Sequence, residues 1–232
     1  MQRWTLLAVV VALAMLAVVP AMAAVSYTGS LTGGDGVGIY APDNHGFGNP
    51  WDSPDTVIGW DVTQVSGGWH YQYDVTVPAK DFSHFILETS ERATITDLVG
   101  ASFDGPQLWS PSDPGASNPE LPGDIFGIKF TPTVDETHFV WEFDSVRSPV
   151  WGDFYAKDGS EGTGPSPHTD VVMWNKGFLL ADPADAPANG SIDNKILRPD
   201  TVTNGSPELS TWMLLACSGI VGLVIRRRKT RK

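Results

Sequence analysis

The strongest constraint on the fold is an alternation of apolar and polar residues with a period of two. Between residues 69 and 77 every second side chain is aromatic or branched aliphatic, in the order WHYQYDVTV. Side chains of a β-strand point alternately to its two faces, so this segment predicts a strand with one buried face. Pro78 follows it, and a proline ends a strand inside a sheet. A Ser-Gly-Gly turn precedes it and predicts a hairpin with residues 57–64.

Similar short apolar segments recur along the chain, separated by turn residues and without a convincing helical period. We predict strands at residues 25–31, 57–64, 69–77, 83–89, 95–103, 126–130, 139–143, 151–156 and 171–180. Short strands without helices between them predict an all-β fold, with a closed barrel as the alternative to a sandwich. The predicted body, residues 24–180, is a single β-sandwich, jelly-roll-like or Ig-like, with long loops and flanking N-terminal signal and C-terminal transmembrane helices.

Two segments of the predicted body lack strand signals. Residues 104–124 hold five prolines and are predicted to be a long loop. Residues 181–205 are rich in Asp, Pro, Ala and Asn and are predicted to be a flexible linker. The only cysteine, Cys217, lies in an apolar segment beyond this linker, so the body must fold without disulfides.

The first residues of the chain have the pattern of an export signal. Arg3 precedes an apolar run from Leu6 to Val19, and Ala21 and Ala23 fit the small-residue pattern of a cleavage site. The run is short for a bilayer span, which needs about 20 residues. We therefore predict a signal peptide at residues 1–23, with an uncleaved anchor helix as the alternative.

The C-terminal residues consist of a short motif, an apolar segment and a basic end. Leu209 to Ile225 is a 17-residue apolar stretch, close to the lower limit for crossing a bilayer as a helix. A dense cationic end remains cytoplasmic, so this stretch predicts a transmembrane helix at residues 209–225 with the acidic body outside. The basic stop consists of Arg226, Arg227, Arg228 and Lys229.

This order of motif, Trp-containing apolar helix and basic cluster resembles the PEP-CTERM sorting signal of bacteria. Proteins with that signal are substrates of exosortase, a membrane protease-transpeptidase, so the resemblance implies a sorting tail at residues 206–232. It implies that Pro207 and Glu208 are recognised and that Trp212 begins the helix. The usual Pro-Glu-Pro is here Pro207-Glu208-Leu209, which leaves the processing position open. A plain membrane anchor is the alternative.

Three segments of the body also resemble exported proteins that carry the same tail. They are residues 83–88, 117–130 and 149–157. This resemblance implies a shared fold and supplies no catalytic residues.

The charge of the chain is unevenly distributed. All 27 acidic residues lie between Ala24 and Glu208, together with only eight of the 15 Lys and Arg residues. A body this acidic repels phosphates, which excludes nucleic acid as a partner. It can attract divalent cations or basic partners.

The sequence has no catalytic motif. The five histidines lack zinc-ligand spacing, and neither a nucleophile elbow nor a dinucleotide fingerprint is present. His70, His84 and His138 alternate with apolar residues, so we predict that they face solvent. Glu142 and Asp153 are the candidate carboxylate pair for carbohydrate chemistry because Trp141 and Trp151 adjoin them. The alternation favours a core position for these tryptophans.

We expect no cofactor, with calcium as the alternative. Asp153, Asp158 and Asp170 border one loop, and carboxylates of this kind are calcium ligands. Asp182, Asp185 and Asp193 border a second acidic segment. Neither segment has an EF-hand or repeat pattern.

Two functional hypotheses follow. The first is an exported, non-catalytic protein of the cell surface or extracellular matrix. In this hypothesis the precursor is anchored in the membrane and exosortase then processes its C-terminal tail. The second is a secreted carbohydrate-binding module or glycoside-active enzyme with extracellular polysaccharide as its partner. The second requires coplanar exposed tryptophans beside a carboxylate pair. The candidate tryptophans are Trp51, Trp69, Trp109, Trp141, Trp151 and Trp174.

Overall fold

The described part of the chain is entirely β-structure and turns. The computed structural model describes residues 24–34, 38–43, 48–90, 93–111, 118–134, 136–158 and 170–200. No helix occurs among them, and hence none that could cross a bilayer. The predicted signal peptide at residues 1–23 and the sorting tail at residues 206–232 lie outside the described residues.

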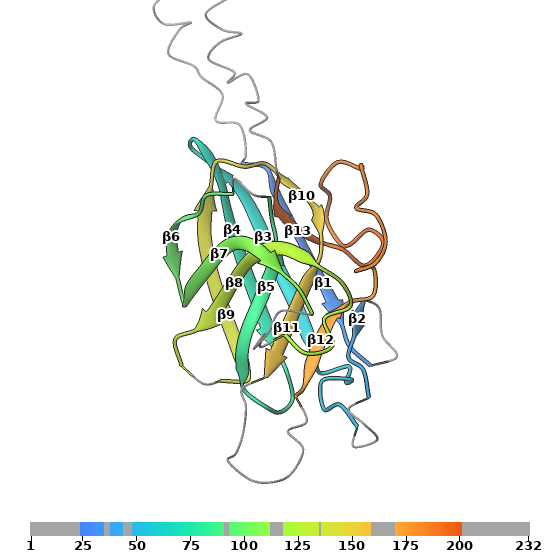
Figure 1. Ribbon diagram of the computed structural model, residues 1–232. Helices are drawn as coiled ribbons and strands as arrows, with labels where there is room; N and C mark the ends of the chain where they lie inside the picture. Colours follow the sequence, from blue (N-terminus) through green and yellow to red (C-terminus); the bar gives the residue numbers. More distant parts are fainter. Residues whose placement is uncertain are drawn as a thin grey trace, which may run out of the picture.

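The first large sheet has five strands in the order β1-β3-β4-β9-β6, and all pairs are antiparallel (Figure 1). Its strands are β1 (Ser26–Thr32), β3 (Val57–Val65), β4 (Gly68–Thr76), β6 (Thr96–Val99) and β9 (His138–Ser145). The predicted hairpin is confirmed, because β3 and β4 pair over their whole length around Ser66 and Gly67. On β4 the alternation also holds: Tyr71, Tyr73 and Val75 are fully buried.

The second large sheet has six strands in the order β2-β12-β11-β5-β8-β7, also antiparallel. Its strands are β2 (Ile39–Tyr40), β5 (Phe82–Glu88), β7 (Ala101–Trp109), β8 (Ile125–Pro132), β11 (Phe154–Asp158) and β12 (Val172–Asn175). A third, two-stranded sheet pairs β10 (Pro149–Gly152) with β13 (Ile196–Pro199). This small sheet lies at the upper end of the molecule in Figure 1.

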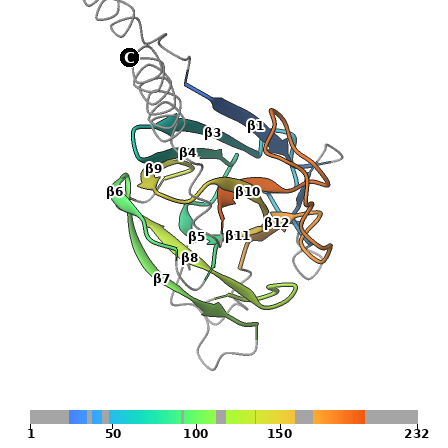
Figure 2. The same ribbon diagram turned by 90° about the horizontal axis from the view of Figure 1, so that it is seen from above.

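Aromatic side chains join the two large sheets, which face each other as in a β-sandwich (Figure 2). The rings of Phe85 on β5 and Trp141 on β9 are 4.7 Å apart. Phe130 on β8 stacks on Phe143 on β9 at 5.5 Å and 11°. Burying such rings is the main favourable term for a fold of this kind, and their edge and stacking contacts add to it. The all-β prediction is therefore confirmed for the described residues.

The predicted linker at residues 181–205 is wrong as far as the structure describes it. Residues 181–200 belong to the folded body, and β13 is its last strand. Ile196 and Leu197 are fully buried in the main core, and Tyr73 donates a 2.8 Å hydrogen bond to the Leu197 carbonyl. The folded body therefore extends past the boundary predicted at residue 180 and includes residues up to 200. Ile196, Leu197 and Arg198 before Pro199 are too short a pattern to reveal a strand from the sequence.

The predicted loop at residues 104–124 is wrong at its N-terminal end and right at its C-terminal end. β7 continues to Trp109 through a register shift between Asp104 and Gln107, where Pro106 lies. Proline is tolerated at such a bulge because no ladder hydrogen bond is lost there. At the other end, β8 begins at Ile125, within a residue of the predicted strand.

The prediction that His84 faces solvent is also wrong. The residue is 3% exposed, because residues 118–121 cover this face of the six-stranded sheet. His84 Nε2 bonds Asn118 Oδ1 at 2.8 Å, and the Tyr155 hydroxyl donates to the Pro119 carbonyl at 2.6 Å. Burial, with Lys129 nearby, lowers the pKa of His84 to about 3, so this imidazole is neutral. A second apolar cluster therefore covers the outer face of the sheet.

The position of β13 in the core predicts that its side chains stabilise the whole domain. Leu197→Ala should lower the free energy of unfolding by about 2–5 kcal/mol, because it removes fully buried carbons and leaves a cavity. Leu179→Ala is the matched control, since this leucine is 75% exposed and its truncation should change the free energy by about 0.5 kcal/mol or less. Urea unfolding followed by tryptophan fluorescence measures both. Equal, small effects would contradict a core position for β13.

Candidate functional site

The three calcium candidates are not brought together. Asp153 precedes β11 and Asp158 ends it, so their carboxyls lie at opposite ends of one strand. Asp158 Oδ1 accepts a 2.9 Å bond from the Val171 amide, and burial raises the pKa of this carboxyl to about 6. Asp170 pairs with the buried Lys157 ammonium at 3.0 Å. The structure therefore separates Asp153 from the other two.

The tryptophans considered for a sugar platform lie mostly inside the body. Four of the six are at most 8% exposed: Trp51, Trp109, Trp141 and Trp151. The two half-buried ones each pack on a tyrosine, Trp69 on Tyr27 and Trp174 on Tyr40. Glu142 contacts Gln72 and His70 on the outer face of the five-stranded sheet. Asp153, the other member of the candidate pair, has different partners, described next.

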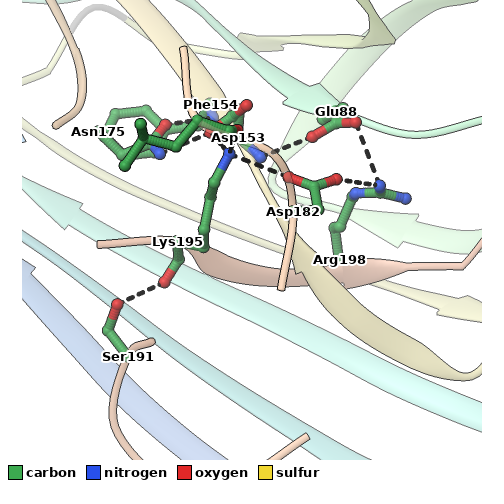
Figure 3. A network of polar contacts seen from close by, with 9 residues as sticks. Glu88, Asp153, Phe154, Asn175, Asp182, Ser191, Lys195 and Arg198 are labelled. Atoms are coloured by element: carbon green, nitrogen blue, oxygen red, sulfur yellow. Dashed lines mark hydrogen bonds and ion pairs between the residues drawn. The ribbon is translucent and has the colours of Figure 1, made fainter. Parts of the chain in front are cut away.

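Five charged side chains form a partly buried network where the small sheet meets the six-stranded sheet (Figure 3). Asp153, Lys195 and Arg198 are buried, whereas Glu88 is half-buried and Asp182 is exposed. The Lys195 ammonium contacts Asp153 Oδ1 at 2.8 Å and Asp182 Oδ1 at 2.9 Å. Arg198 Nη2 contacts Asp182 Oδ2 at 2.8 Å and Glu88 Oε1 at 3.1 Å. Asp182 therefore bridges the two cations, and each cation also holds one carboxylate of the sandwich.

Neutral groups complete the network. Lys195 donates a third bond to the Leu180 carbonyl at 2.8 Å, which satisfies all three ammonium hydrogens. Asn175 donates to Asp153 Oδ1 at 2.6 Å and accepts from the Phe154 amide at 3.0 Å. The Asp153 amide donates to Glu88 Oε2 at 2.8 Å. Buried charges persist only when paired and hydrogen-bonded in this way.

The local backbone places these side chains. Asp193 and Asn194, at φ values of 50° and 59°, turn the chain just before Lys195. Asp and Asn are the non-glycine residues that tolerate this left-handed conformation best. Gly152 lies against Arg198, where a Cβ would overlap Nε and approach Glu88 Oε2 to 2.7 Å. The absence of a side chain at residue 152 thus makes room for the guanidinium.

Burial and pairing shift the pKa values of the network in identifiable directions. Burial raises the pKa of Glu88 to about 7, although Arg198 opposes the shift. Burial likewise raises the pKa of Asp153 to about 6, against the opposing bonds from Lys195 and Asn175. For Lys195 burial alone would lower the pKa, but the bonds to Asp153 and Asp182 outweigh it and raise the pKa. At neutral pH we assign Lys195 and Asp153 as an ion pair, since they touch at 2.8 Å.

The three carboxylates have the spacing of a cation site, but the chain supplies the cations itself. Oxygens of Glu88, Asp153 and Asp182 lie within 4.8 Å of one another. Oxygen-rich clusters of this size suit calcium. A divalent ion would have to displace the fully buried Lys195 ammonium from two of them. In the structure the cluster forms an internal ion-pair network.

Histidines with carboxylate partners form separate pairs on the outer face of the five-stranded sheet. His70 Nδ1 lies 2.7 Å from Asp144 Oδ1, and His138 Nε2 lies 2.9 Å from Asp74 Oδ1. The prediction that His70 and His138 lie on the outer face is confirmed, since their side chains are 35% and 56% exposed. Exposed pairs of this kind contribute about 1 kcal/mol or less.

Comparisons of the chain with protein-family models, curated proteins and solved structures found no match. Sequence reasoning named Asp153 as a calcium candidate and as a partner of Glu142, and it named Asp182 as part of a second acidic segment. It missed Glu88, Lys195 and Arg198. The sequence signal that could have revealed the network is the pair Lys195 and Arg198, which flank two apolar residues in an otherwise acidic segment. Their partners lie 42 and 110 residues away in the chain, so no local pattern reveals the contacts.

Because Lys195 and Arg198 already occupy the carboxylates of the cluster, we expect the protein to be indifferent to calcium. Millimolar calcium, the range of extracellular sites, should change the melting temperature by about 1 °C or less. Differential scanning calorimetry with and without chelator measures this. A rise of several degrees would show that a calcium site exists after all.

We expect that replacing Lys195 greatly lowers the stability of the domain. Lys195→Met leaves Asp153 and Asp182 without their shared cation and should cost about 3–5 kcal/mol of unfolding free energy. The matched control is Lys176→Met, at an exposed lysine of the same segment, which should cost about 1 kcal/mol or less. Similar urea midpoints for the two variants would contradict the role assigned to Lys195.

Proposed function

We propose that the chain is an exported, non-catalytic protein of the cell surface or extracellular matrix, sorted through its C-terminal tail by an exosortase-type membrane enzyme. The observation that carries the proposal is the tail itself. Pro207 and Glu208 precede an apolar segment, and a dense basic end follows it. Cations in such number do not cross a bilayer readily, so the segment would stop with the acidic body outside.

The folded body offers support at the point where the tail begins. β13 ends at Pro199, so the domain would reach almost to the sorting motif. In the proposed orientation β13 connects the domain to the membrane-spanning segment, so the domain would lie close to the membrane. The acidity of the body suits a soluble, exposed protein that does not bind nucleic acid.

The charged groups of the body support a non-catalytic role. Perturbed pKa values often mark active sites, but structural ion-pair networks perturb them too. Here the shifted groups Glu88 and Asp153 are engaged with Arg198 and Lys195, and His84 is buried and neutral. None of these has the combination of exposure and free reactive atoms that a nucleophile or general base needs.

For the fold within the sandwich class we propose a jelly-roll-like arrangement over an Ig-like one. The chain changes sheet between β4 and β5, between β5 and β6, and between β6 and β7. It changes sheet again between β8 and β9. Repeated crossing between two sheets, with the hairpins β3–β4 and β7–β8 between the crossings, fits the successive Greek keys of a jelly roll.

The carbohydrate-active alternative receives less support. It requires exposed coplanar tryptophans beside a carboxylate pair. Trp141 and Trp151 are each 1% exposed, and Glu142 and Asp153 have separate partners.

The sorting proposal predicts that one carboxyl controls processing. Glu208→Ala should leave export intact and abolish C-terminal processing in the native cells, as read from the intact mass of the mature protein. Asp185→Ala is the matched control, because it removes the same charge from an exposed loop of the body and should be processed normally. If Glu208→Ala and wild type have the same C-terminal mass, the sorting proposal is wrong.

A further inference from the structure

The network divides into a sandwich side and a C-terminal side with unequal charge. Glu88 and Asp153 belong to the sandwich and carry two negative charges when ionised. Asp182, Lys195 and Arg198 belong to the C-terminal segment, residues 176–200, and together carry one positive charge. The fully ionised cluster therefore holds one uncompensated negative charge in a largely buried place, which is costly.

One bound proton would make the charges of the two sides equal and opposite, and Glu88 is the carboxylate that we expect to bind it. Asp153 touches the Lys195 ammonium, which keeps it ionised, whereas Glu88 contacts only Arg198 among the cations, and Arg198 is shared with Asp182. With Glu88 protonated, one negative charge of the sandwich faces one net positive charge of the C-terminal segment. Carboxylate oxygens of Asp153 and Asp182 lie within 4.8 Å of Glu88, so their negative charge favours its protonated form.

We propose that this cluster is a proton-operated clasp, which takes up one proton on Glu88 and then holds the C-terminal segment more tightly against the sandwich. The segment is also attached by the buried side chains of Ile196 and Leu197 and by the hydrogen bonds of Asn189 and Gly190 with Thr28. β13 pairs only with β10, over four residue pairs. Tyr73 adds its bond to the Leu197 carbonyl, and two ion pairs join the segment to the sandwich.

Of the other titratable groups around the clasp, Asp153 gives a response of the same sign and the two buried tyrosines give none. Tyr71 and Tyr73 face Arg198 from β4, and burial raises the pKa of both phenols so far that they stay neutral. Asp200 lies near Tyr71 beyond the end of β13. Asp153 responds in the same direction as Glu88, at lower pH.

The sign follows from the two protonation states of Glu88. Its pKa is raised from 4.5 to about 7 when the clasp is closed. Between these values the closed form keeps the proton and the open form releases it, so closure weakens as the pH rises through this window. Above it both forms are ionised and the dependence ends. The clasp is therefore tight in acid and loose at slightly alkaline pH.

The clasp would matter for processing because it grips the last strand before the tail, a link that rests on the proposed function. Releasing residues 176–200 from the sandwich would lengthen the tether between the domain and the membrane. Loosening would then give a membrane-bound enzyme more reach to the sorting motif. The clasp itself does not depend on that link.

Hydrogen exchange of the full-length chain in mild detergent tests the clasp without any processing enzyme. Opening constants of peptides covering β13, corrected for intrinsic exchange, should rise about tenfold or more between pH 5 and pH 8 in wild type. In Glu88→Gln, which cannot ionise, the rise should shrink severalfold. Asp74→Asn removes the same charge from the exposed face of β4 and should keep the wild-type response.

Three results would overturn the clasp: no rise in wild type, a rise in the opposite direction, or an undiminished rise in Glu88→Gln. If that variant fails to fold, a carbon-13 NMR titration of Glu88 in wild type decides, with a midpoint near 7 expected and one below about 5 overturning the proposal. The sorting proposal and the clasp proposal can be rejected independently. Glu208→Ala reports on processing, whereas hydrogen exchange and the NMR titration report on the folded domain.

Discussion

A lysine side chain with no exposed surface is the constraint on which the end of this domain depends. Lys195 has three acceptors within 2.9 Å, and without them its charge would be too costly to bury. Satisfying it requires Asp153 at the start of β11, Asp182 from the preceding loop and a left-handed turn at residues 193–194. The same arrangement leads β13 into the core and so includes residues up to 200 in the folded body.

Aromatic packing supplies stability in this fold, whereas the buried charges determine how the C-terminal segment is positioned. The rings between the sheets supply the apolar burial that holds the sandwich together without disulfides. The charged network adds little net stability over an apolar equivalent, but it penalises any arrangement that leaves one partner alone. It therefore specifies where the C-terminal segment docks. For a protein proposed to hang from its C-terminus, that docking site is where the domain meets its anchor.

The sequence predicted the parts of the fold that local periodicity governs. The hairpin of β3 and β4 and the buried face of β4 follow from alternation over nine residues and a turn, which no distant contact alters. The prediction ended β7 too early because Pro106, which lies in a bulge, has the sequence signal of a loop. It placed His84 in solvent because the local alternation does not reveal the distant loop that covers this residue. β13 and the network were missed for a stronger reason. Lys195 and Arg198 resemble linker residues until partners far along the chain neutralise them, and such pairing has no sequence period.

If Lys195 and Asp153 act as one unit in closing the domain, a double-mutant cycle will measure their interaction. Urea unfolding of Asp153→Asn, Lys195→Met and the double variant gives the coupling free energy of the pair. A buried, directly bonded pair predicts coupling of about 1–3 kcal/mol, so the double variant should lose much less than the two single losses added together. Additivity within about 0.5 kcal/mol would contradict the account, because it would mean that the two side chains do not interact in the folded protein.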